Sequence, residues 1–439
     1  MRTLRIALLL LCAATPSFAQ DTARMEQVIQ SYVKNRTFMG TVLVARGADV
    51  VLSKGYGSAN LEWDVPNTPS TKFRIGSLTK QFTAASILLL EERGKLKVDD
   101  PITKYLPDAP PEWGRITIYN LLTHTSGIPN FTALPEYNTL KATNTTVDKT
   151  IASFKDKPLD FGPGEKMSYS NSGYLVLGYV IEKVTGGSYG KFVLDNIFTP
   201  LAMKDSGYDS TTTVIARRAS GYAPSATGVV NAGYVHMSIP HAAGALYSTT
   251  GDLLKWEQGL FGGKLLSAAS LQKMTTPFKN DYAFGLTSRL DKGRRIIWHN
   301  GGIDGFNSSM AYYPDTKTVV VVLANLNGPV ADLLASQLGG LAHGDAIKLP
   351  SERTEVTVPA ATLEKYVGAY ELAPTATMTI TLESGHLMAQ LTGQGKNPIF
   401  PESETLFFLK IVDAQLEFAA DGSSLVLHQN GRDLKANRK

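Results

Sequence analysis

Two groups of strand-like segments lie far apart in this sequence, and a mostly helical region separates them. Residues 40–45 and 50–54 run apolar or alternate around a Gly-Ala-Asp turn, which predicts a β-hairpin. From about residue 101 to residue 248 the apolar spacing is mostly helical. Strand signals return at residues 296–299, 309–313 and 319–323. We therefore predict an α/β fold in which one sheet combines strands from both sides of the helical region.

A second, smaller unit is predicted at the C-terminus. The polar, proline-containing stretch at residues 347–361 is typical of a linker. Beyond it, apolar residues alternate strictly with threonine over residues 377–382, and short alternating segments follow. This pattern predicts a small antiparallel barrel or sandwich over residues 362–439, after a larger domain at residues 20–346.

Residues 1–19 have the features of a secretory signal. Arg2 and Arg5 form a basic start, residues 6–14 are apolar, and Ser17-Phe18-Ala19 is a small-x-small cleavage site. The alternative, a membrane anchor, needs about 20 apolar residues, and this run is much shorter. We therefore expect an exported protein, periplasmic or secreted, with no stable membrane insertion after cleavage.

The only cysteine, Cys12, lies within this predicted signal, and Leu11 precedes it where lipoprotein signals carry a small residue. The mature chain then has no disulfide, thiolate metal site or cysteine nucleophile. Loss of two arginines leaves 41 basic residues against 39 acidic ones (43 less two), and no basic run suggests a nucleic-acid partner. No metal or other cofactor is predicted, because His236 and His241 do not share a helix face.

The first candidate for chemistry is Ser77-Leu78-Thr79-Lys80. It follows a strand-like segment and opens an apolar helix, in which residues three apart share a face, so Lys80 can reach Ser77. A serine needs a base to act as a nucleophile, and a lysine serves only if its pKa is lowered. The same spacing recurs at Ser31, Ser188 and Ser270, so only its context favours Ser77.

The second and third candidates are Tyr169-Ser170-Asn171 and His299-Asn300-Gly301-Gly302. In the former, a phenol can move a proton and an amide can hold a substrate, although Asn171 could also be an ordinary helix cap. In the latter, glycines directly after a strand can expose a backbone N–H to an oxyanion. The alternative for this motif is a hairpin turn with a surface histidine.

Together and in this order, the motifs resemble the serine hydrolases that include class C β-lactamases, D-alanyl-D-alanine carboxypeptidases, D-aminopeptidases and related esterases. These enzymes carry Ser-x-x-Lys, Tyr-x-Asn and then Lys- or His-x-Gly. The similarity extends over roughly residues 26–345 and includes residues 73–82, 121–127 and 163–178. It implies a β-lactamase-like α/β domain, an antiparallel sheet with flanking helices and a mostly helical insertion.

The resemblance also implies roles. Ser77 attacks a carbonyl and forms an acyl-enzyme, while Lys80 and Tyr169 share the work of base and acid. The backbone N–H groups of Ser77 and Gly302 form the oxyanion hole, and His299 supplies a cation or a hydrogen-bond donor. Substrate-binding positions are Asn171, Asn300 and Gly301. His124, in the matching segment 121–127, we interpret as a structural, hydrogen-bonded histidine.

The substrate is predicted only by class: a small peptide, amide or ester. His299 stands where β-lactamases have lysine, which favours a D-amino-acid peptidase or esterase over a class C-like β-lactamase. Arg289, Arg294 and Arg295 are either grips for a substrate carboxylate or a solvated hairpin. Carboxypeptidases of this family have threonine where this chain has Asn300. The activity of an aminopeptidase or an esterase therefore remains an alternative. A non-catalytic cell-wall peptide-binding protein is the remaining alternative, and the sequence predicts no oligomeric state.

Overall fold

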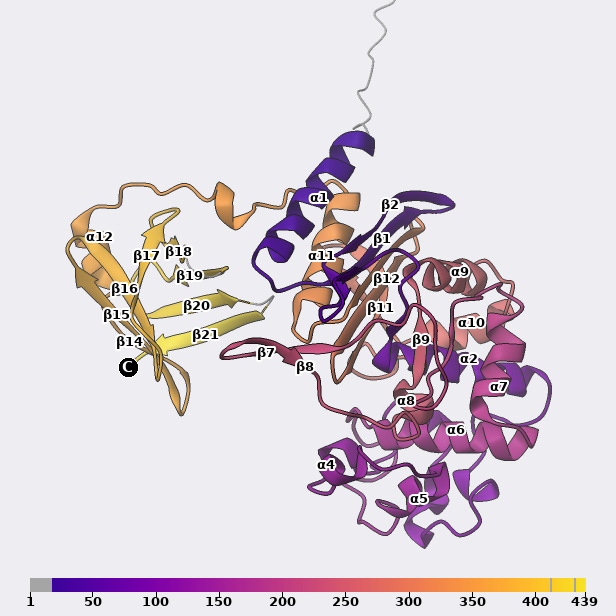
Figure 1. Cartoon of the computed structure of the whole chain (residues 1–439). Coiled ribbons are helices and arrows are strands. Elements are labelled where there is room, and N and C mark those ends of the chain that lie inside the picture. Colours follow the sequence, from indigo (N-terminus) through magenta and orange to yellow (C-terminus); the bar gives the residue numbers. More distant parts are fainter. Residues whose placement is uncertain (1–17, 411–412, 430–431) are drawn as a thin grey trace, which may run out of the picture.

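The computed structural model describes residues 18–410, 413–429 and 432–439 (Figure 1). The predicted signal at residues 1–19 lies outside them except for Phe18 and Ala19, which start helix α1 (Phe18–Lys34). Among these described residues, no helix combines the length and apolar character that crossing a membrane requires.

A six-stranded antiparallel sheet forms the centre of the larger domain, in the order β10-β11-β12-β13-β1-β2. The strands are β1 (Gly40–Arg46), β2 (Asp49–Tyr56), β10 (Thr287–Asp291), β11 (Arg294–Ile303), β12 (Phe306–Tyr313) and β13 (Thr318–Ala324). Strand β1 pairs with β13, so the N-terminal hairpin joins strands that follow the helical region. The prediction of one sheet built from distant segments is therefore confirmed.

Helices cover both faces of this sheet (Figure 1). Helices α1 and α11 (Val330–Ala342) pack on one face, and α2 (Thr79–Glu92), α6 (Asn171–Thr185) and α9 (Thr250–Phe261) belong to the core on the other. In β13, Val319, Val321 and Leu323 enter one core, while Val320 and Val322 enter the other. The unbroken β-branched run of this strand follows from its two buried faces.

The segments between these elements are short and position the site. They are β3 (Ser58–Asn60), β4 (Val65–Pro66), β5 (Phe73–Arg74), the 3₁₀ turn η1 (Gly76–Leu78), α3 (Ile118–Leu122), α4 (Tyr137–Leu140), α5 (Val147–Ala152), α7 (Tyr189–Val193), β6 (Gly207–Tyr208), β7 (Tyr222–Ser225), β8 (Gly228–Asn231), α8 (His241–Gly244), β9 (Leu246–Ser248) and α10 (Ala268–Thr275). Strands β5, β9 and β6 form a small sheet that leads directly into η1.

The C-terminal unit is a closed antiparallel barrel of eight strands, preceded by helix α12 (Ala360–Tyr366). Its strands are β14 (Gly368–Ala373), β15 (Ala376–Glu383), β16 (His386–Leu391), β17 (Asn397–Pro401), β18 (Leu406–Phe408), β19 (Ala414–Phe418), β20 (Ser424–Gln429) and β21 (Arg432–Arg438). Tyr366, Tyr370, Phe407 and Phe418 fill a core of its own. The predicted small antiparallel β-domain is confirmed, and it is a barrel.

Candidate active site

Ser77 lies in η1, the single turn that joins strand β5 to helix α2. The turn starts at Gly76, whose φ of 51° lies in the left-handed region that favours glycine. A Cβ atom on Gly76 would stand 2.9 Å from the amide nitrogen of Gly302. Glycine therefore lets the turn that carries Ser77 pack closely against strand β11, where the third motif lies.

The Lys80 amine contacts a residue of each of the first two motifs, Ser77 and Asn171. Its Nζ lies 3.0 Å from Ser77 Oγ, 2.8 Å from Asn171 Oδ1 and 2.8 Å from the carbonyl oxygen of Ala243. The last of these contacts comes from helix α8, a segment to which the sequence assigned no role. The predicted Ser-x-x-Lys pair is thus in hydrogen-bond contact.

Lys80 is fully buried, and among the described residues no carboxylate forms an ion pair with it. Burial lowers the pKa of its amine well below the ordinary value of 10.5. The three contacts fit a neutral amine, because two N–H groups suffice for the oxygens of Asn171 and Ala243. The nitrogen lone pair is then left for the hydroxyl of Ser77.

The Tyr169 ring lies beside this amine, with Lys80 Nζ 4.9 Å from the ring centroid. The Tyr169 hydroxyl is buried and makes no hydrogen bond of normal geometry with the described residues. Burial raises the pKa of Tyr169, and the nearby Ser77 side chain offsets this only in part. The phenol is therefore protonated at neutral pH, and it lies next to a neutral lysine.

Asn171 is the first residue of helix α6, so it is not the helix cap of the alternative prediction; Ser170 takes that position. Its Nδ2 donates to Thr132 Oγ1 at 3.1 Å, and its backbone N–H donates to Asn130 Oδ1 at 3.0 Å. With Oδ1 accepting from Lys80, both ends of the amide have protein partners. The side chain is thereby fixed in one orientation.

The third motif lies at a free edge of strand β11. Strand β10 pairs with β11 only as far as Trp298, so the rest of β11 has a neighbour strand on one side alone. The turn to β12 has two residues, and the closing pair of such hairpins, here Ile303 and Phe306, is hydrogen-bonded. The alternation of an antiparallel pair then directs the N–H of Gly302 away from β12, toward Ser77.

Gly301 packs directly on the turn that carries the nucleophile. A Cβ atom there would stand 2.1 Å from the carbonyl oxygen of Ile75 and 3.0 Å from the amide nitrogen of Ser77. The Ser308 hydroxyl also donates to the Ile75 carbonyl, at 2.8 Å. The glycine that we predicted to bind substrate thus contacts the backbone of η1.

The side chain of Asn300, a predicted substrate-binding residue, is bound elsewhere. Its Nδ2 donates to Asp332 Oδ2 of helix α11 at 2.7 Å. Because side chains alternate along a strand, Asn300 and its neighbour His299 extend from opposite faces of the sheet. The Asn300 side chain therefore lies on the α11 face, and only its backbone is on the side of Ser77.

The three arginines, for which the sequence left carboxylate binding and a solvated hairpin open, lie in the paired strands β10 and β11. Arg294 donates to both carboxylate oxygens of Asp345, at 2.8 Å and 2.6 Å. The Arg289 guanidinium lies 5.8 Å from the ring centroid of Trp298, a residue of the α1 and α11 core. Arg295 is exposed in the hairpin that joins β10 to β11. The solvated-hairpin alternative accounts for this segment better than carboxylate binding does.

His299 is buried within strand β11, so the alternative of a surface histidine in a turn is wrong. Burial and the nearby Lys80 lower the pKa of His299 to about 3. Its Nε2 lies 3.2 Å from the Tyr282 hydroxyl and its Nδ1 lies 2.6 Å from the Asn300 carbonyl. The ring is therefore neutral, so of the two predicted alternatives, a cation or a hydrogen-bond donor, the cation does not apply.

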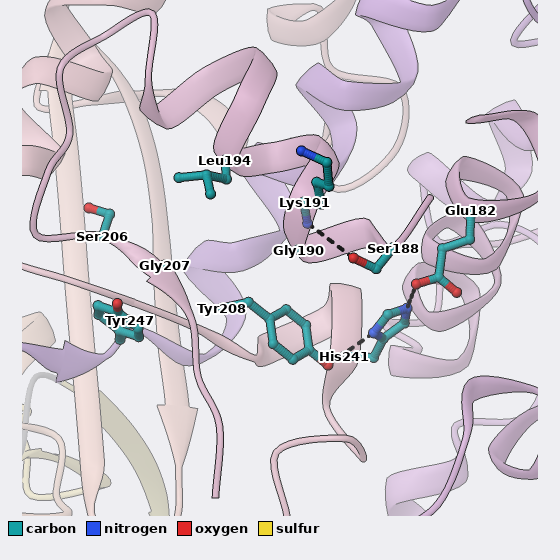
Figure 2. A pocket seen from close by; sticks show the side chains of 10 residues that line it. All are labelled: Glu182, Ser188, Gly190, Lys191, Leu194, Ser206, Gly207, Tyr208, His241 and Tyr247. Carbon is teal, nitrogen blue, oxygen red and sulfur yellow. Dashed lines mark hydrogen bonds and ion pairs between the residues drawn. The ribbon is translucent and has the colours of Figure 1, made fainter. Parts of the chain in front are cut away.

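Helix α8 packs against helix α2, which carries Lys80. Its Ala242 carbonyl accepts from the Thr83 hydroxyl at 2.7 Å, next to the Ala243 carbonyl that accepts from Lys80. Figure 2 shows His241, the first residue of α8, between Tyr208 and Glu182 at the wall of a cavity of about 520 Å³. Its Nδ1 lies 3.1 Å from the Tyr208 hydroxyl, so α8 is anchored on the side away from Lys80.

A serine beside a buried amine, on a turn between an antiparallel sheet and a helix, defines a serine hydrolase. The chain belongs to the beta-lactamase family, whose model matches residues 25–342. A second family, described as a domain of unknown function (DUF3471), matches residues 352–435. Penicillin-binding protein 4* of Bacillus subtilis is 30% identical, over 94% of this chain and 98% of that protein.

Solved structures show the same similarity. The octameric penicillin-binding protein homologue from Pyrococcus abyssi has 26% sequence identity and a TM-score of 0.70, and the match covers 95% of this chain and 100% of that chain. The D-amino acid amidase from Ochrobactrum anthropi SV3 has 26% identity and a TM-score of 0.65, with 74% of this chain and 99% of that chain covered. The chain is thus a serine hydrolase of the β-lactamase and penicillin-binding-protein type.

Proposed function

We propose that this hydrolase cleaves amides, peptides or esters of D-amino acids through an acyl-enzyme on Ser77. The observation that carries the proposal is the contact of 3.0 Å between Ser77 Oγ and the buried amine of Lys80, which forms no ion pair with the described residues. The similarity to a D-amino acid amidase over 74% of this chain supports the substrate class. A histidine, not a lysine, in the third motif supports it over a β-lactamase.

In the first half of the reaction, Lys80 acts as the base. Its neutral amine takes the proton of Ser77 as Oγ attacks the substrate carbonyl. The carbonyl oxygen becomes negative and accepts hydrogen bonds from the N–H groups of Ser77 and Gly302. Each such donor typically contributes about 3 kcal/mol to transition-state stabilisation.

Tyr169 completes the proton transfer. Because its phenol is protonated, it can give a proton to the departing amine or alcohol and recover one from the Lys80 ammonium. This leaves the acyl group on Ser77, a free leaving group and a neutral lysine. Water then attacks the acyl-enzyme, with the same groups acting in reverse order.

Intact-mass analysis and kinetics on matched D- and L-phenylalanine amides test this function, with Ser77→Ala as the control. We expect turnover of the D-enantiomer at least about 10-fold faster than of the L-enantiomer, and none by the variant. Equal rates for the two enantiomers would contradict the D-specific assignment. Persistent activity in Ser77→Ala would exclude this nucleophile.

The β-lactamase alternative predicts rapid turnover of a chromogenic cephalosporin with no lasting adduct on Ser77. A slow-deacylating peptidase instead accumulates that adduct. The non-catalytic alternative predicts no covalent labelling at all, and a ligand affinity that Ser77→Ala leaves intact. A lasting adduct in the mass spectrum after incubation with a penicillin therefore identifies the peptidase, and turnover of the cephalosporin separates the β-lactamase from the non-catalytic protein.

We also propose that the protein is exported and that residues 1–19 are removed. Cleavage after Ala19 leaves Gln20 as the first residue, within the segment that forms helix α1. Mass analysis of the protein from an exporting bacterial host should give a chain that starts at Gln20. A chain that keeps residues 1–19 in the cytoplasmic fraction would contradict export.

A further inference from the structure

Three buried side chains form a continuous hydrogen-bonded chain behind the nucleophile. His124 Nε2 lies 3.0 Å from the Tyr282 hydroxyl, which lies 3.2 Å from His299 Nε2. They come from three separate places: the loop after α3, the loop before β10, and strand β11. Tyr282 is the central member, and no motif in the sequence marks it.

The direction of the hydrogen bond between His124 and Tyr282 follows from the second ring nitrogen of His124. The backbone N–H of Ser170 donates to His124 Nδ1 at 3.1 Å, so this nitrogen carries no proton. A neutral imidazole then has its proton on Nε2, which faces Tyr282. His124 therefore donates to the Tyr282 oxygen.

The His299 end is fixed independently. Its Nδ1 lies 2.6 Å from the carbonyl oxygen of Asn300, which can only accept, so Nδ1 carries the proton. Its Nε2 then has a lone pair that accepts from the Tyr282 O–H. Both assignments agree at Tyr282, which accepts one hydrogen bond and donates the other.

The surroundings favour this neutral arrangement. The titratable groups next to these three hydrogen-bonded side chains are Lys80 from α2, Tyr169 and Tyr174. No carboxylate among the described residues contacts either imidazole. Burial lowers the pKa of His124, and the nearby Lys80 lowers it further. Burial also raises the pKa of Tyr282, so all three groups are neutral.

We propose that Tyr282 is a positioning residue: its hydroxyl holds His299 in the Nδ1–H tautomer and thereby fixes the Asn300 carbonyl at the edge of β11. The next peptides of this edge carry Gly301 and Gly302, which contact η1 and supply the oxyanion donor. His299 then has no N–H for a substrate, and it acts by ordering the strand. The inference rests on the proposed role of Gly302 but not on the identity of the substrate.

The test uses Tyr282→Phe, with Tyr119→Phe as a matched control, since the Tyr119 ring packs against Phe278 and Phe284 in T-shaped pairs in the same region. Nitrogen NMR of the imidazoles, assigned with His299→Gln, should show the Nδ1–H tautomer of His299 in the wild type from about pH 5 to about pH 8. In Tyr282→Phe we expect a mixture of tautomers. Labelling of Ser77 by a fluorophosphonate should slow about 10-fold, with an altered pH profile, and the control should match the wild type.

An Nε2–H tautomer or an imidazolium of His299 in the wild type at neutral pH would overturn the proposal, even if every variant misfolds. So would a Tyr282→Phe variant that labels Ser77 at the wild-type rate. If no D-amino-acid substrate is turned over while the fluorophosphonate still labels Ser77, the proposed substrate fails and this inference stands.

Discussion

Substitution of Gly301 by alanine tests how tightly the nucleophile turn must pack on strand β11. The added Cβ would lie 2.1 Å from the Ile75 carbonyl oxygen, 2.4 Å from Ser308 Oγ and 3.0 Å from the Ser77 nitrogen. An ordinary contact needs at least 3.4 Å, so η1 and β11 must separate by about 1.3 Å (3.4 Å less 2.1 Å). Overpacking of this kind costs about 1–3 kcal/mol of stability. A 1 Å displacement of reacting groups costs about 100-fold in rate.

Both quantities are measurable on purified protein. We expect Gly301→Ala to lower the melting temperature by several degrees and the rate of Ser77 labelling by about 100-fold. The adjacent Gly302→Ala is the matched control for stability, because its Cβ would meet only Asn307 Nδ2, at 3.5 Å. A Gly301→Ala protein with wild-type melting and labelling would refute the close packing of η1 on β11.

Three further predictions follow from the buried groups. Since Lys80 must be neutral to act as a base and its pKa is lowered, kcat/KM should be constant at high pH and fall as pH drops through that value; a flat profile would exclude this base. Asn171→Leu removes the oxygen that accepts from Lys80 and should lower kcat about 10- to 100-fold, whereas an unchanged kcat would show that Lys80 needs no such partner. Burial raises the pKa of Glu257 from 4.5 to about 8, so its proton stabilises the fold at low pH and this contribution is lost as pH rises to about 8. Urea unfolding should show a decline of at most about 5 kcal/mol over that window, from about 1.4 kcal/mol per pH unit, and Glu257→Gln should remove it; equal slopes in both proteins would contradict the assignment.

The parts of the fold that the sequence predicted are those with local signatures. The β-branched run of β13 indicated a strand, and the apolar and alternating residues of β1 and β2 indicated a hairpin. The helical region between these segments indicated that one sheet combines them. The Ser77 and Lys80 contact followed from helical spacing. The direction of the Asn300 side chain was not predicted, because the strand signal ended at residue 299. Strand β11 continues to Ile303, and its alternation turns Asn300 to the opposite face.

Other parts of the site had no signature to find. Ala243 holds Lys80 through its backbone carbonyl, and any residue type supplies that group. Tyr282 lies in a loop, and its role depends on two histidines that come from distant segments. Such contacts exist only after the chain has folded, so residue types and spacing could not reveal them.

The four Ser-x-x-Lys sequences of this chain show why context decides the chemistry. Lys34 is exposed, Lys191 is 70% exposed and pairs with Asp195 at 2.7 Å, and Lys273 is 50% exposed and pairs with Glu91 at 2.9 Å. Each of these three amines thus lies in solvent or beside a carboxylate, and none lies in the buried environment that a neutral lysine base requires. Of these four lysines, Lys80 alone is buried and without a counter-ion among the described residues. The motif sets the distance between the serine hydroxyl and the lysine amine. The tertiary fold buries the Lys80 amine and lowers its pKa, so that this amine can act as a base.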